Sequence, residues 1–342
     1  LCLGILLGLV SLTACDENAS ITYVDGNGQE QTMQVTATDD KEVIQTVIEF
    51  AGKAAYDDIT SFTLKESVSV SASLTKDMNA ALELGAKDKL SGSANMVLNV
   101  SKDKGLDLSA SGNLSLGKDN QAKVSADVIY EGALDQMLTE NQYVYVDASY
   151  DVKSIANTSK GSVKKAIDTL ALMEEAKEEL DDIISNFLPG EEPDFGDDMG
   201  FGSIEDFYTN FKNSKLTISN VKNGVIYLEA DLALKDLINY VDPDNAELKP
   251  LLKLETSFVF TYGIEASTGR FREFNFEFDD VSLLNLMITA LLGSVDIYAS
   301  TSAMATYVET FHFESKFAIE YNNAKIRTLS DADKAKYSKD TI

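Results

Sequence analysis

Apolar and polar residues alternate over long stretches of this 342-residue chain. Between positions 62 and 74, apolar side chains occupy nearly every second position, and Ser, Thr or Lys fill most of the positions between them. A period of two is that of a β-strand with one face buried and the other in water. Only Glu66 interrupts the apolar row. The stretch therefore predicts a long, half-buried strand.

The same alternation recurs and predicts two antiparallel meanders. It covers residues 94–100, 106–116, 122–128 and 143–149 in the first half, and residues 216–221, 225–234, 258–264, 274–278 and 307–321 in the second. The apolar positions are mostly Ala, Val and Leu in the first meander, and aromatic residues become common in the second. His312 falls in the polar set of the last strand. Antiparallel sheets of this kind have one wet face and one apolar face that must be covered.

Helical periodicity predicts helices in four places. The first follows Asp39 and Glu42, which are spaced as a capping box. Ser162 is expected to cap a second, amphipathic helix. The other two are residues 235–252 and 281–299. The last of these is either a helix against the apolar face of the sheet or a membrane-contacting flap, and its moderate length favours the helix.

Composition excludes several classes of function. The chain has 56 acidic and 29 basic residues, a net charge of -27, so a nucleic-acid partner is not expected. It has one histidine and lacks a nucleophile elbow, a P-loop and a dinucleotide-binding glycine pattern, so we expect neither an enzyme nor a cofactor. The acidic segment 190–203 does not follow the ligand order of an EF-hand loop, so it is interpreted as a solvated loop and no metal site is expected.

The first residues carry a targeting signal. An apolar run ends at Leu12-Thr13-Ala14-Cys15 and is followed by acidic residues. The run is too short for a membrane-spanning helix and has the length of a signal-peptide core. Its end resembles a bacterial lipobox, in which the cysteine receives a diacylglyceryl thioether. The resemblance implies that Cys15 is acylated and anchors the protein to the extracytoplasmic face of the cell membrane.

These elements give an expected organisation of the chain. It consists of a signal peptide (1–14), an acylated cysteine and tether (15–20), one domain (21–330) with a helical insertion (160–212), and a C-terminal tail (331–342). No Met, Lys or Arg precedes the apolar run, so the sequence is expected to begin inside a longer signal. The fold class predicted for the domain is α+β: a long-stranded, curved antiparallel sheet, or half-barrel, with helices packed on its concave face.

This pattern, with a Thr268-Gly269 turn between two aromatic strands, is similar to the superfamily of LolA-type carriers and LppX-type lipid-transport lipoproteins. The resemblance implies a pocket for acyl chains between the sheet and its helices, and it implies no catalytic residue. The candidate lining residues are Met96, Leu98, Leu108, Val124, Phe258, Phe260, Phe274, Phe276 and Phe313, and the residue types by themselves favour plain core packing. We therefore expect a lipoprotein that binds or transports a hydrophobic ligand. The alternative is a surface scaffold or adhesion lipoprotein with a filled core.

Overall fold

The computed structural model describes most of the predicted domain. The described residues are 18–25, 28–81, 89–137, 139, 141–154, 157–170, 204–241, 252, 255–285 and 307–340. The lipobox with Cys15, the acidic segment 190–203 and the later parts of three predicted helices lie outside them.

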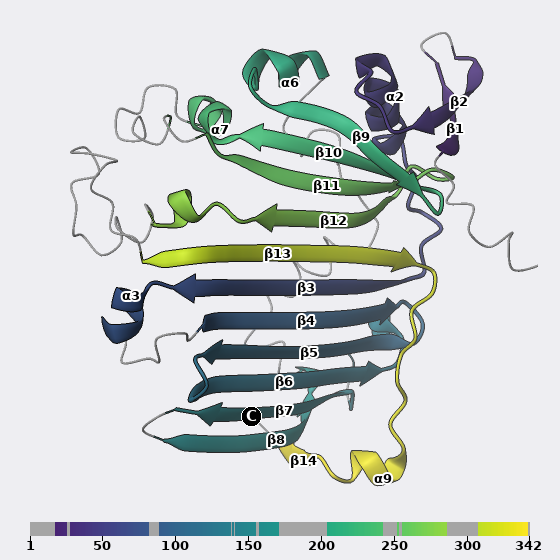
Figure 1. Cartoon of the computed structure of the whole chain (residues 1–342). Coiled ribbons are helices and arrows are strands. Elements are labelled where there is room, and N and C mark those ends of the chain that lie inside the picture. The colour runs from purple at the N-terminus through teal and green to yellow at the C-terminus, as the bar shows by residue number, and fades with distance from the viewer. Residues whose placement is uncertain are drawn as a thin grey trace, which may run out of the picture.

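A single open sheet of twelve strands forms the body of the molecule (Figure 1). Its spatial order is β14-β8-β7-β6-β5-β4-β3-β13-β12-β11-β10-β9, and every neighbouring pair is antiparallel except β14 and β8. The strands are β3 (Ser61–Leu74), β4 (Lys89–Ser101), β5 (Gly105–Leu116), β6 (Asn120–Glu131), β7 (Tyr143–Lys153), β8 (Thr158–Asp168), β9 (Lys215–Lys222), β10 (Val225–Ala233), β11 (Ser257–Glu265), β12 (Phe271–Phe278), β13 (Val308–Tyr321) and β14 (Ser338–Asp340).

The two predicted meanders are joined into this one sheet by β13. That strand pairs with β12 on one side and with β3 on the other, although β3 precedes it by more than two hundred residues. The pairing places Phe313 opposite Val70 and Phe317 opposite Glu66. Apolar positions of the second meander thus continue those of the first. The prediction of a long-stranded antiparallel sheet is confirmed.

The smaller elements lie mainly at the β9 end of the sheet (Figure 1). They include a hairpin of β1 (Asn18–Val24) and β2 (Glu30–Thr36). The helices are α2 (Lys41–Ala51), α3 (Lys76–Ala81), η2 (Leu134–Gln136), α6 (Ile204–Asn210), α7 (Leu234–Val241) and α9 (Asp331–Lys334). The N-cap of α2 is Asp40 and not Asp39, because the Asp40 carboxylate accepts the backbone N–H of Glu42 at 2.9 Å.

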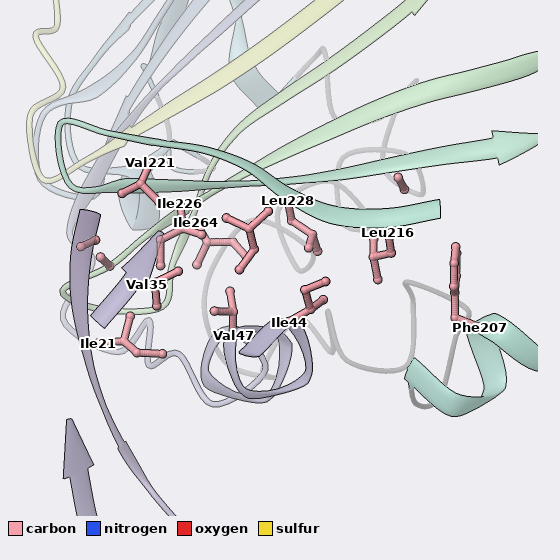
Figure 2. Close-up of a cluster of buried hydrophobic side chains, with 14 of the residues drawn as sticks. Ile21, Val35, Ile44, Val47, Phe207, Leu216, Val221, Ile226, Leu228 and Ile264 are labelled. Carbon is pink, nitrogen blue, oxygen red and sulfur yellow. The ribbon is translucent and has the colours of Figure 1, made fainter. Parts of the chain in front are cut away.

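The main hydrophobic core lies between β9–β11 and the elements packed on them (Figure 2). Ile44 and Val47 of α2 point toward Ile226 and Leu228 of β10, and each of these four side chains is at most 1% exposed. Ile21, Val35 and Phe207 close the cluster from the hairpin and from α6. The apolar stripe of α2 is therefore what places that helix against the sheet.

A second, smaller cluster joins α7 to the sheet. Leu234 and Ile238 pack with Leu283, and the rings of Phe258 and Phe278 lie against them. Residues 281–285 are helical, so the predicted helix 281–299 begins as expected. Leu283 is buried against Leu234 and Ile238, and this contact with the domain favours the helix over the membrane-contacting flap. The rest of that prediction falls on residues outside the described part.

The predicted helix start at Ser162 is wrong, because Ser162 lies in the middle of β8. This strand pairs with β7 along its whole length, from Thr158 to Asp168. Val163 and Ile167 suggested a helical stripe, but residues four apart share a face in a strand as well as in a helix. The described helical residues begin only at Thr169, where Asp168 accepts the backbone N–H of Leu170 at 3.0 Å.

The chain after β13 crosses the ends of β4–β8 and returns to the sheet edge (Figure 1). We call residues 322–340 the C-terminal strap. The Arg327 guanidinium donates to the buried carboxylate of Asp107 from Nε (2.8 and 2.9 Å) and from Nη2 (2.6 Å), and its backbone N–H donates to the same carboxylate at 3.0 Å. Nη2 also donates to Asp127 at 2.9 Å. Lys334 pairs with Glu131 at 2.8 Å. The segment expected as a tail from residue 331 thus contributes α9 and β14 to the fold.

Candidate functional site

One face of the sheet is apolar from one edge to the other, because the cross-strand register aligns apolar positions of neighbouring strands. One row consists of Val70, Gly92, Leu114, Ala122 and Val152. The next row consists of Val68, Ala94, Gly112, Val124 and Tyr150. The opposite face carries mainly Ser, Asn, Asp and Lys. His312 lies on that polar face, exposed and opposite Ser71, as predicted.

The apolar face is exposed over β5–β8. Five large side chains there are more than a third exposed: Leu114 (52%), Val124 (54%), Tyr150 (46%), Val152 (38%) and Val163 (39%). They are neighbours in the register, and we call them the open patch. Monomeric proteins rarely expose a contiguous apolar patch of more than a few hundred Å², and such patches usually mark a binding surface.

A shallow depression of about 330 Å³ adjoins the open patch over β3–β6. Its floor is low because it is formed by the small residues Ala94, Ala110 and Gly112, whereas Leu108 and Leu114 flank the last two on β5. Met96 and Val124 border it. A second hollow of about 540 Å³ shares Gly112 and Val124 with the first. Pockets for small ligands have volumes of roughly 300 to 1,000 Å³, so each hollow is of a suitable size.

Glu66 is the one carboxylate that lines the depression. In the register it lies between Met96 of β4 and Phe317 of β13, so both cross-strand neighbours are apolar. Within the described residues its carboxylate makes no hydrogen bond and no ion pair, and the residue is partly buried. The charge that broke the alternation in the sequence therefore stands on the apolar face.

Aromatic rings fill the other end of the apolar face. The rings of Phe260 and Phe276 are 4.9 Å apart, and that of Phe313 lies 5.8 Å from Phe276. Burial raises the pKa of Tyr262 in this region, which reflects its low polarity. The clusters under α2, α6 and α7 cover β9–β11 and Phe278 of β12, so this part of the face is packed as a core, whereas Phe274, Phe276 and Phe313 are partly buried.

The nine predicted lining residues all lie on the apolar face, but the structure divides them between its two ends. Met96 and Val124 border the depression, and Leu98 and Leu108 lie in the row next to it. The five phenylalanines belong to the aromatic end. The prediction missed four residues of the open patch: Leu114, Tyr150, Val152 and Val163. Leu114 was in the predicted alternation, whereas Val163 was assigned to a helix.

Metal-ligating side chains do not gather in the described part of the chain. There, no three or more His, Cys, Asp or Glu side chains are grouped so that they could hold a metal ion. Within the same residues, no helix has the length and apolar character needed to cross a membrane. A scan against protein-family models, a search of curated proteins and a search of solved structures each gave no match.

Proposed function

We propose that this protein is a membrane-anchored lipoprotein that binds or transports a hydrophobic ligand on the apolar face of its sheet. In this proposal the sheet acts as a half-barrel, with its helices on the concave side, and the ligand occupies the open patch and the depression beside it. Cys15 would carry the anchoring lipid.

The observation that carries this proposal is the unequal covering of the apolar face. Helices α2, α6 and α7 and the β1–β2 hairpin pack over β9–β11 and the end of β12 at Phe278, whereas the open patch remains exposed at the β5–β8 end. Burying one methylene group gains about 0.8 kcal/mol. An acyl chain laid across the patch would therefore gain free energy in two ways. Its own methylene groups would leave water, and so would the exposed side chains of Val124 and Tyr150 that it covers.

Ligand binding can be tested on the full chain with Cys15→Ser, so that no acyl chain of its own can occupy the face. We expect lipid in organic extracts of the purified protein, seen by mass spectrometry, and binding of an uncharged fluorescent acyl probe. Ala94→Leu with Ala110→Leu should fill the depression and weaken probe binding about tenfold, which corresponds to about 1.4 kcal/mol.

The control places the same change in volume on the polar face. Ser71 and Ser91 are exposed cross-strand neighbours on β3 and β4, so Ser71→Leu with Ser91→Leu should leave probe binding unchanged. If the parent chain carries no lipid and binds no probe, the scaffold alternative replaces the proposal. If both double variants lose binding equally, the ligand does not occupy the depression.

The lipid anchor is tested separately. When the producing bacterium is fed an alkyne-tagged fatty acid, we expect the full chain to become labelled and to sediment with membranes. Cys15→Ser should abolish both properties, because the thiol is the site of attachment. Cys2→Ser is the matched control, since it removes the chain's other cysteine and should leave the labelling intact. Equal labelling of both variants would reject the lipobox interpretation.

A further inference from the structure

Glu66 constrains the ligand chemistry of the apolar face, given the proposed function. A ligand that covers the depression must also cover this carboxylate, whose cross-strand neighbours are Met96 and Phe317. Removing a charged group from water costs several kcal/mol unless a partner compensates it. No described residue supplies that partner, so the compensation has to come from the ligand.

Two carboxylates on the neighbouring strand β13 are paired. Glu320 forms an ion pair with Lys65, and Glu314 forms one with Lys316, both on the polar face. Lys65 precedes Glu66 directly, but adjacent residues of a strand point to opposite faces. Lys65 thus pairs with Glu320 and not with Glu66, whose negative charge lies beside the apolar depression without a described partner.

The net charge of the whole chain also favours a cationic ligand over an anionic one. With a net charge of -27, the protein repels anionic amphiphiles such as free fatty acids and attracts cationic ones. At Glu66, an anionic head group would meet a second carboxylate at short range. A cationic head group would form a charge-assisted hydrogen bond there while its tail covered the Ala and Val side chains of the depression.

We propose that the occupant of this site is an amphiphile with a cationic head group, which pairs with Glu66 while its apolar tail lies over the depression and the open patch. This inference rests on the proposed function and adds the charge and placement of the head group. Glu66 then determines specificity, and the apolar residues determine affinity for the tail.

The test compares three probes with the same twelve-carbon tail: dodecylammonium, dodecanol and dodecanoate. Binding to the full chain with Cys15→Ser is measured by calorimetry, below the micelle concentration of the two charged probes and below the solubility limit of dodecanol. We expect dodecylammonium to bind at least tenfold more tightly than dodecanoate. Glu66→Gln keeps the shape of the side chain and removes its charge, so it should remove most of this preference and leave dodecanol binding nearly unchanged.

The matched control is Glu314→Gln, which makes the same change in net charge on the polar face, directly beside Ser315, the partner of Val68 in β13. It should retain the preference for dodecylammonium. Equal binding of all three probes, or the same preference in both variants, would overturn the inference while leaving the proposed function standing. Failure of every probe to bind would overturn both. A stable dimer in light scattering whose contact covers Val124 would instead assign the face to a second copy of the chain.

Discussion

Replacing Arg327 with methionine is expected to lower the free energy of unfolding by about 2 to 3 kcal/mol and to release the C-terminal strap from the sheet. The Asp107 side chain is only 4% exposed, and its charged partner in the strap is this guanidinium; the backbone N–H of Arg327 also donates to it at 3.0 Å and would remain in the variant. Breaking a fully buried ion pair costs roughly 3 to 5 kcal/mol. The expected loss is smaller because the Arg327 side chain is 46% exposed. Urea unfolding measures the loss, and hydrogen exchange in β14 reports the release.

The control for this prediction lies in the same strap. Lys336 pairs with Asp333 on the surface, and both side chains are about half exposed. Because exposed ion pairs add little to stability, Lys336→Met should leave the unfolding curve and the exchange of β14 unchanged. The interpretation fails if the two variants unfold alike, or if β14 remains protected in Arg327→Met.

The strap contact should also depend on pH. Burial raises the pKa of Asp127, but hydrogen bonds from Ser109 and Arg327 outweigh this effect and hold the pKa below its ordinary value. A carboxyl group whose pKa is lowered by folding adds stability above its unfolded pKa, about 4, and this contribution is lost as the pH falls through the folded-state pKa. The stability difference between Arg327→Met and the parent chain should therefore narrow below about pH 4.

The strands were predictable from sequence because each carries its own signal. Alternation marks both the strand and the face that its side chains share. It was therefore possible to predict, without knowing which strands pair, that all nine candidate lining residues lie on one apolar face. The same signal contains no information on which strands meet. Nothing in the pattern of β13 indicates that it lies between β12 and β3, because that choice depends on the completed sheet.

The covering of the apolar face was not predictable for a related reason. An apolar position gives the same sequence signal whether a helix covers it, as at Ile226, or leaves it exposed, as at Val124. The C-terminal strap has no periodicity, and its main contact joins Arg327 to an aspartate 220 positions earlier. Glu66 is the exception: a charge in an apolar row was visible in the sequence and lines the depression in the structure.

Replacing Gly269 with alanine is expected to lower the free energy of unfolding by about 3 kcal/mol, although the Thr268-Gly269 turn is only a weak signal in the sequence. Gly269 has φ +75°, where an L-residue other than glycine loses roughly 1 to 2 kcal/mol. A Cβ atom there would also lie 2.7 Å from the backbone oxygen of Phe50, at the end of α2. The oxygen belongs to the main chain, so it cannot move aside without displacing the helix end.

A second glycine of the same conformation separates these two costs. Gly224, in the β9–β10 turn, has φ +74°, and a Cβ atom built on it has nothing within 4 Å. Gly224→Ala should therefore lower the free energy of unfolding only by the conformational cost of a positive φ, about 1 kcal/mol. The difference in unfolding free energy between the two variants then measures the contact of the Thr268-Gly269 turn with α2. Urea unfolding of both proteins, with hydrogen exchange in α2, provides the measurement. Equal losses would mean that the turn before β12 does not hold α2 in place. A larger loss for Gly269→Ala, with faster exchange confined to α2, would show that the β11–β12 turn positions the helix that covers this end of the sheet.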